Sequence, residues 1–366
     1  MNQPNDQRIV MTLDAGGTNF VFNAVQRNEE MLESIVLPAG GRDLEEVLKT
    51  IIDSFRQVKE RLHTAPVAIS FAFPGPADFE HGIIGDSQNL PFFRGGVALG
   101  PMLEEQFGIP VFINNDGDLF TYGEAISGLL PEINRKLEEA GNPRRYYNLI
   151  GVTFGTGFGG GIVTRHGLLM GDNCAGGEIN RVRNRTFKQW DAEESVSIRG
   201  LKREFANQTG LNIASCPEPK EIFEIANGTK KGNQEAAIRA FEAYARDAAD
   251  AIANAVTLID GLVVIGGGLA GAWPLFLPKL VEEMNAPFDT MSGTPLDRME
   301  VIAFNLEDKQ GLAGFLQSTA NEIRVPFSDR KVLYDPAKRV GVGITKLGTS
   351  RAVSIGACAY ALSRIS

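Results

Sequence analysis

The chain has 366 residues, of which 43% are hydrophobic and 22% charged, and this composition excludes a disordered chain, a collagen and a coiled coil. At roughly 150 residues per domain, the length predicts about two domains. The formal net charge of −9 argues against a broad nucleic-acid surface, because such a surface needs clustered lysine and arginine. We therefore expect no nucleic-acid partner.

The cysteines and the apolar segments favour a cytoplasmic protein with no membrane partner. Cys174, Cys216 and Cys358 are dispersed and form no CxxC pair, which suits a reducing compartment. The N-terminus shows no secretory signal. The most apolar segment, residues 261–278, contains five glycines and two prolines, so we interpret it as a buried strand, a turn and the start of a helix.

The first half of the chain predicts a hairpin followed by alternating helices and strands. The hairpin turn is the segment from Asp14 to Thr18. Asp43 is expected to cap the first helix, with Glu46 as its capping-box partner. The expected elements are strands at residues 9–13, 19–25 and 34–38, a helix at 44–62, strands at 67–73 and 110–114, and a helix near 119–129.

The second half repeats this order, although the two halves share little sequence identity. A duplicated α/β protein with a cleft between its halves is the natural architecture. Residues 166–233 are irregular, and no elements are assigned there. The expected elements are strands at residues 147–154 and 162–165, a helix at 235–259, strands at 262–265 and 300–304, and a helix at 352–362.

The first glycine turn, from Asp14 to Thr18, has the residue types of a phosphate site. Gly16 and Gly17 expose backbone N–H donors, and Thr18 adds a hydroxyl. Asp14 offers a carboxylate to a hydrated Mg²⁺, a cation that prefers one or two carboxylates together with phosphate oxygens. A plain hairpin turn is the alternative.

Two further glycine turns follow predicted strands. Residues 155–161 contain GxGxxG, but a dinucleotide site would need a helix directly afterwards, and the following residues have strand character. We therefore expect a second hairpin turn that presents N–H groups and Thr156. The third turn, residues 266–268, follows a buried strand. Ligands of α/β sheets lie at the carboxyl ends of strands, so the three turns together indicate one ligand site.

Several short segments share the order and spacing of the motifs of a known family. They are DAGGTNF (14–20), PGPADFEHGII (74–84), Asn89-Leu90-Pro91, NND (114–116) with Gly123-Glu124, GTGFGGGI (155–162), AGGEI (175–179), VVIGGGLAG (263–271) and IGACAYA (355–361). These segments resemble the ROK family of sugar kinases, within the superfamily of hexokinase, actin and the heat-shock chaperone ATPase domain. The resemblance runs from Ile9 to about Ala361.

The resemblance implies an α/β fold of two lobes, formed by duplicated ribonuclease H-like domains of the actin/hexokinase type with an interdomain cleft. The small lobe would comprise residues 1–118 and 350–366, and the large lobe residues 119–349. A homodimer is also implied. The chain departs from the family at its zinc-binding cysteine motif, which is missing, so we expect no structural zinc. Arg181 stands where the family has a histidine, and Asn19 where it often has a lysine.

The resemblance assigns roles to individual residues. Asp116 would be the general base, although a helix N-cap is the alternative for this residue taken alone. Asp14 would orient Mg²⁺ through water. The residues expected to bind the sugar are Gly75, Asn89, Asn115, Asp116, Glu178, Arg181 and Glu193, with Glu194 as the alternative to Glu193. The residues expected to bind ATP are Gly16, Gly17, Thr18, Asn19, Gly155, Thr156, Gly157, Gly267 and Gly268.

The expected function is ATP-dependent phosphorylation of a hexose, at the 6-hydroxyl of an aldohexose such as glucose. N-acetylhexosamine, mannose, fructose and allose are alternative substrates. A sugar-responsive regulator of the same family is disfavoured, because only thirteen residues precede Asp14 and cannot form a DNA-recognition domain. A nucleotide-gated interaction protein is disfavoured by the NLP and AGGEI segments.

Overall fold

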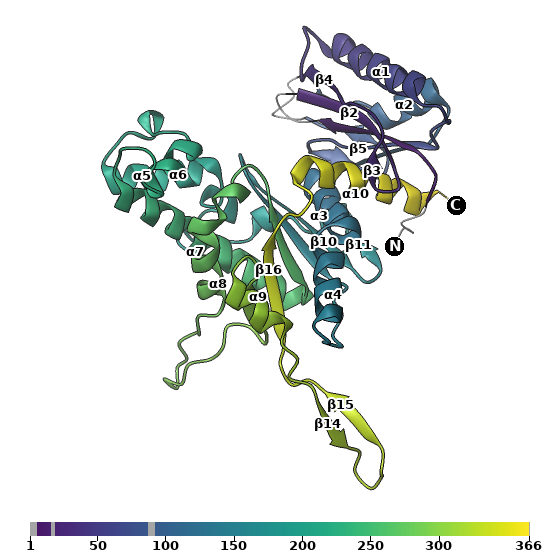
Figure 1. Ribbon diagram of the computed structural model, residues 1–366. Coiled ribbons are helices and arrows are strands. Elements are labelled where there is room, and N and C mark those ends of the chain that lie inside the picture. The colour runs from purple at the N-terminus through teal and green to yellow at the C-terminus, as the bar shows by residue number, and fades with distance from the viewer. Residues whose placement is uncertain (1–5, 16–18, 87–91, 366) are drawn as a thin grey trace. The chain divides into compact units, whose positions relative to one another are not determined.

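The computed structural model describes residues 6–15, 19–86 and 92–365, which form two compact units (Figure 1). Unit 1 comprises residues 1–128, 161–177 and 346–366, and unit 2 comprises residues 129–160 and 178–345. Among the residues described, no helix combines the length and the apolar character that crossing a membrane requires.

The sheet of unit 1 is a hairpin extended by parallel strands. β1 pairs antiparallel with β2 and parallel with β5, and β5 pairs parallel with β8. The strand order is β3-β2-β1-β5-β8, and β4 also pairs with β2. The strands are β1 (Val10–Ala15), β2 (Asn19–Gln26), β3 (Glu29–Glu30), β4 (Ile35–Pro38), β5 (Ala68–Ala72) and β8 (Val111–Asn114).

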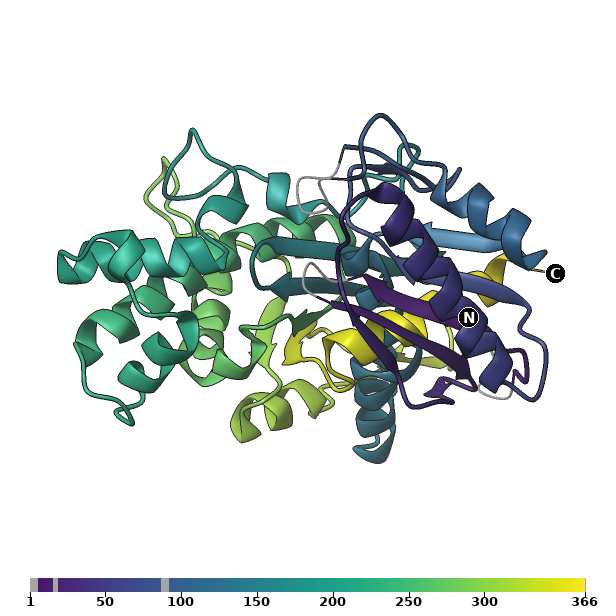
Figure 2. The ribbon, with the colours of Figure 1, turned by 90° about the horizontal axis from the view of Figure 1, so that it is seen from above.

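Helices cover both faces of this sheet. Alternate residues of a strand point to opposite faces, so Met11 and Leu13 belong to the cluster that contains α1 (Leu44–Arg61) and α2 (Leu99–Phe107). Val10 packs instead with residues of α10 (Thr349–Arg364). Figure 2 shows this sandwich, with α1 in front of the strands and the yellow α10 behind them.

The N-terminus of α1 confirms one half of the predicted capping box and corrects the other. Asp43 accepts a hydrogen bond from the N–H of Glu46 at 2.9 Å, as expected of an N-cap. The Glu46 carboxylate, however, accepts from the N–H of Arg42 at 2.6 Å and not from that of Asp43. The same carboxylate is 3.1 Å from the Arg42 guanidinium, and this ion pair draws it one residue further back.

Helix α3 (Asp116–Ser127) packs against α10 with almost no space between their backbones. A Cβ at Gly123 would lie 1.9 Å from the carbonyl oxygen of Ala352, and a Cβ at Gly356 would lie 1.9 Å from that of Leu119. Each helix therefore needs glycine where it meets the other. This packing fixes the start of α3, which carries Asp116, relative to the C-terminal helix.

The second six-stranded sheet, most of which belongs to unit 2, repeats the order of the first. Strands β9, β12, β16 and β13 follow one another as parallel neighbours. The full order is β11-β10-β9-β12-β16-β13, so a predicted duplication of the α/β arrangement is confirmed. The strands are β9 (Leu149–Phe154), β10 (Phe158–Thr164), β11 (Gly167–Leu168), β12 (Leu262–Gly266), β13 (Ile302–Asn305) and β16 (Arg339–Ile344).

A helical layer packs on the sheet of unit 2. Residues of α7 (Gln234–Ile259) and α8 (Trp273–Met284) form one apolar cluster with β9 and β12. The same cluster includes α5 (Ile198–Thr209) and α6 (Pro219–Ala226), which lie in the region that the sequence left unassigned. Two further helices of this unit are α4 (Leu129–Glu139) and α9 (Lys309–Leu316).

Two small antiparallel hairpins were not expected. β6 (Ala77–Asp78) pairs with β7 (Ile83–Ile84) in unit 1. In unit 2, β14 (Asn321–Arg324) pairs with β15 (Lys331–Tyr334) and projects from the rest of that unit (Figure 1).

Candidate functional site

In unit 1, the site residues of two strands lie in one row across the sheet. Ala72 of β5 is the register partner of Asp14 in β1 and of Asn114 in β8. Because neighbouring strands are about 4.8 Å apart, the backbones of Asp14 and Asn114 are roughly 10 Å apart at the carboxyl edge of the sheet. Asn115 and Asp116 follow directly after this row.

The N-cap of α3 is Asn115 and not Asp116, for which capping was the alternative role. Asn115 is the N-cap of α3, with extended backbone angles, and its Oδ1 accepts from the N–H of Gly117 at 2.7 Å. Asp116 is the first residue of the helix, and its Oδ1 accepts from the same N–H at 2.9 Å. The second carboxylate oxygen of Asp116 is therefore not required for capping.

The surrounding protein raises the pKa of both Asp14 and Asp116 above the ordinary aspartate value. Although Asp116 is accessible to solvent, desolvation by the surrounding protein raises the pKa of its carboxyl, against the opposing hydrogen bond from Gly117. Desolvation also raises the pKa of Asp14, a hydrogen bond from Ser350 lowers it, and the charge of Asp116 raises it further. The two carboxylates thus repel each other.

This pair fits a hard divalent cation. Two partly desolvated carboxylates that repel each other are oxygen donors whose charge a cation such as Mg²⁺ would neutralise. Within residues 6–15, 19–86 and 92–365, no group of three or more histidine, cysteine, aspartate or glutamate side chains is arranged to hold a metal ion. A Mg²⁺ ion oriented by Asp14 through water would take its ligands from water and phosphate.

Three motifs that are distant in sequence meet at the start of α3. A Cβ at Gly161, in the second glycine segment, would lie 2.6 Å from the carbonyl oxygen of Gly117 and 2.7 Å from the Thr121 hydroxyl. Gly177, from the AGGEI segment, has a φ of +83°, and a Cβ there would lie 3.1 Å from the Cα of Gly161. These glycines allow the motif backbones to contact one another directly.

In unit 2, the second and third glycine turns lie next to each other. They follow the adjacent parallel strands β9 and β12, and a Cβ at Gly155 would lie 3.9 Å from the backbone nitrogen of Gly268. Gly267 has a φ of +87°, and a Cβ there would lie 2.3 Å from the carbonyl oxygen of Phe154. Only glycine fits at this position, so the two turns form one glycine-rich surface.

The structure distinguishes Glu193 from Glu194. Glu193 lies in a 3₁₀ turn (Ala192–Glu194), and its Oε2 accepts from the N–H of Phe158, directly after the second glycine turn, at 3.0 Å. A Cβ at Gly157 would lie 2.5 Å from the same oxygen. Glu194 forms an ion pair with Arg199 at 2.7 Å and, among the residues described, makes no such contact with the turn, whereas Glu193 Oε1 lies 3.5 Å from the same guanidinium. Glu193 is therefore the residue that contacts a predicted binding segment.

The remaining predicted site residues are near the surface. Arg181 forms an ion pair with Asp191 at 3.4 Å, which reduces its availability to a ligand. Glu178 is exposed at the start of a 3₁₀ turn (Ile179–Arg181) and makes no capping hydrogen bond there. Gly75 is exposed after β5, Asn19 is exposed at the start of β2, and Thr156 is exposed in the second glycine turn.

Four predicted residues lie outside the described part of the chain, namely Gly16, Gly17, Thr18 and Asn89. Sequence reasoning missed Ser350, whose side chain binds Asp14 from the first turn of α10. It also left Glu124 without a role. The carboxylate of Glu124 is buried and accepts from the N–H groups of Lys346 and Leu347, both at 3.1 Å, just before α10 begins.

The chain belongs to the ROK family, whose model matches residues 10–320 and thus ends immediately before β14. A glucokinase from Parabacteroides distasonis is 53% identical in sequence to this chain, with complete coverage of both chains, and its crystal structure matches with a TM-score of 0.90. A glucokinase of Thermotoga maritima is 26% identical over 82% of this chain and 94% of its own length. An N-acetyl-D-glucosamine kinase of Vibrio cholerae is 25% identical over 70% of this chain and 83% of its own length. The chain is accordingly an ATP-dependent sugar kinase with the two-lobed α/β fold of this family.

Proposed function

We propose that the chain transfers the γ-phosphoryl group of ATP to the 6-hydroxyl of an aldohexose, with glucose as the preferred acceptor and Asp116 as the general base. The observation that carries this proposal is that Asn115, and not Asp116, is the N-cap of α3. Asn115 caps α3, so a carboxylate oxygen of Asp116 is available to accept a proton from an alcohol.

The raised pKa of Asp116 supports its role as a base. A carboxylate with a pKa above the ordinary value of about 3.9 is a stronger proton acceptor than an ordinary aspartate. Proton removal from the primary hydroxyl would accompany attack of its oxygen on the γ-phosphorus, with ADP as the leaving group. Positioning of the reactants and charge stabilisation supply most of the rate enhancement in such transfers.

The glycine turns would hold the nucleotide. Backbone N–H groups at Gly155 and Gly157 and the hydroxyl of Thr156 are suited to phosphate oxygens, and Gly267 and Gly268 would line the adenosine site. Gly16, Gly17, Thr18 and Asn19 would supply the first phosphate segment. Mg²⁺, when bound, would neutralise phosphate charge, and Asp14 would orient it through water.

The sugar would be held by the polar residues that the family resemblance assigns to it. The amide nitrogen of Asn115 is a donor for a hydroxyl, because its oxygen is the one used in capping. Glu178 is an exposed acceptor, and Glu193 has a second oxygen, 3.5 Å from the Arg199 guanidinium, beyond the one that binds Phe158. Gly75, Asn89 and Arg181 complete the expected set.

The names of two relatives support glucose, and one names a different sugar. The Parabacteroides and Thermotoga proteins are glucokinases, whereas the Vibrio protein is a kinase of N-acetyl-D-glucosamine. The identity of 53% with the first favours glucose over the N-acetylated sugar. Mannose, fructose and allose remain in the test panel because their hydroxyls are similar.

The test compares sugars and variants in a coupled assay of ADP release with Mg-ATP. We expect the highest kcat/KM with glucose, a product phosphorylated at the 6-position, and a loss of kcat of roughly a thousandfold in Asp116→Asn with sugar binding retained. Asp53→Asn, a change of the same chemistry on the exposed side of α1, is the control and should leave kcat unchanged. ADP release that no sugar stimulates, or full activity in Asp116→Asn, would overturn the proposal.

A further inference from the structure

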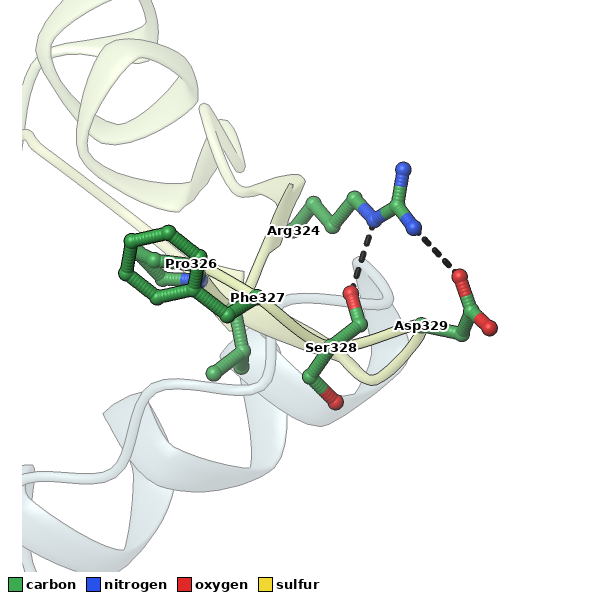
Figure 3. Close-up of a pocket in the computed structure, with 6 residues that line it drawn as sticks. Arg324, Pro326, Phe327, Ser328 and Asp329 are labelled. Atoms are coloured by element: carbon green, nitrogen blue, oxygen red, sulfur yellow. Dashed lines mark hydrogen bonds and ion pairs between the residues drawn. The ribbon is translucent and has the colours of Figure 1, made fainter.

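Residues 317–338 form an arm whose tip is the β14–β15 hairpin. The register pairs Ile323 with Val332 and Asn321 with Tyr334, so Ile323, Val332 and Tyr334 share one face. These three side chains are 44%, 39% and 51% exposed. At the tip, the ring of Phe327 lies beside Pro326, away from the ion pair of Arg324 with Asp329 (Figure 3).

The base of the arm is fixed to the body of unit 2. Asp335 accepts from the Thr319 hydroxyl across the two chain segments of the arm. Its carboxylate also forms ion pairs with Arg144 at 3.3 Å and Arg339 at 3.4 Å. The side chains of Asp335 and Arg339 are only 12% and 5% exposed, so the arm starts from a defined position.

Such an arm is incomplete as a folding unit. A two-stranded hairpin is marginally stable in water, and three or more strands with a covered apolar face are normally needed. The apolar face of this hairpin has no cover within the described residues, because its strands form a sheet of only two. β14 carries the charged Glu322 and Arg324 but no proline, so no residue of the strand lacks the backbone N–H that sheet pairing needs.

We propose that β14 pairs antiparallel with β14 of a second copy of this chain, across a two-fold axis at Ile323. The product is a four-stranded sheet in which Ile323 faces the partner's Ile323 on the apolar side. On the other side, Glu322 faces the partner's Arg324, and Arg324 faces the partner's Glu322. The strand is therefore complementary in charge to itself.

The charges of Glu322 and Arg324 favour this register over registers in which the two strands are shifted. A two-fold axis at Glu322 would place two glutamates opposite each other, and an axis at Arg324 would place two arginines opposite each other. A shift of the pairing by a single residue would turn the apolar side chains of one copy to the charged face of the other. Within one copy, Glu322 already pairs with Lys331 at 2.9 Å, and Arg324 donates to Ser328 and Asp329. The second carboxylate oxygen of Glu322 and the five N–H donors of the Arg324 guanidinium are enough for a further pair.

The test exploits this self-complementarity. Glu322→Arg gives two arginines on β14, and Arg324→Glu gives two glutamates, so each variant repels its own copy while the two variants attract each other. In sedimentation equilibrium we expect a wild-type dimer, a dimer dissociation constant raised roughly ten- to a hundredfold in each variant alone, and recovery when they are mixed. Glu45→Arg and Arg56→Glu on α1 are matched exposed controls, and both should behave as wild type.

Other outcomes overturn the inference. A wild-type chain that is monomeric at tens of micromolar has no such contact. A dimer that both variants retain uses another surface, and variants that stay monomeric when mixed lack the proposed register. Ile323→Asp adds an independent measurement, because it places a charge on the two-fold axis. Sugar-kinase activity and circular dichroism of each variant verify that the chain is folded, and they keep this test separate from that of the proposed function.

Discussion

The carboxylate of Glu193 accepts a hydrogen bond from the backbone N–H of Phe158, with 3.0 Å between Oε2 and the nitrogen. This contact links the 3₁₀ turn of Glu193 to the residues that follow the second glycine turn. We expect Glu193→Ala to raise the KM of sugar or nucleotide about tenfold, since the turn loses a charge-assisted hydrogen bond. Steady-state kinetics measure the change. Glu194→Ala removes only the pair with Arg199 and should change KM less than about threefold, and equal effects of both substitutions would contradict the assignment.

The acid limb of the pH–rate profile should report Asp116. A general base must be deprotonated, and desolvation raises the pKa of this carboxyl. We therefore expect kcat/KM to fall, as the pH decreases, at a higher pH than the ordinary aspartate value of about 3.9. The profile should be measured over the range in which the chain stays folded. A rate that is flat down to the ordinary value would contradict the role of this carboxylate.

The raised pKa of Asp116 also predicts that Asp116→Asn, which lowers activity, makes the folded chain more stable. A carboxyl whose pKa is raised by folding destabilises the folded state when ionised, and this penalty disappears as the pH falls through the raised pKa. Near neutral pH, Asp116→Asn should therefore raise the unfolding temperature of the ligand-free chain by roughly 2–4 °C. Thermal unfolding measures this shift. The same substitution at exposed Asp53 is the control, and a marked drop for Asp116→Asn would count against a desolvated carboxylate.

The contact between α3 and α10 should be intolerant of even one methyl group. Gly123→Ala and Gly356→Ala each place a Cβ 1.9 Å from a carbonyl oxygen of the facing helix, so we expect each to lower the free energy of unfolding by about 2–4 kcal/mol. Denaturant titration measures the loss. Gly271→Ala, where no atom lies within 4 Å of the new Cβ, should cost less than about 1 kcal/mol.

Much of the fold follows from local sequence patterns. The β1–β2 and β9–β10 hairpins, the helix after Asp43 and the second and third glycine turns depend on residue alternation, helical spacing and glycine positions, and the structure has them near the expected residues. The family resemblance was needed for the site, because no local pattern shows that Asp14 and Asn114 share one row of the sheet.

The features that sequence analysis missed depend on distant contacts or on competition between neighbours. Ser350 binds Asp14 from the other end of the chain, and nothing in the sequence near either residue indicates this. Asn115 and Asp116 are both good N-cap residues, so only the backbone angles decide between them. The β14–β15 hairpin did carry a local signal, since short alternating segments flank Pro326 and Asp329.

The late position of α10 in the chain has a consequence for biosynthesis. This helix covers one face of the first sheet and interlocks with α3 through Gly123 and Gly356, yet the ribosome makes it after every residue of unit 2. When the last residue of unit 2 has been translated, one apolar face of the N-terminal strands is still uncovered, because α10 has not yet been made. We expect the unit that is translated second to finish folding first, and chaperones to meet the N-terminal segment while it is still incomplete.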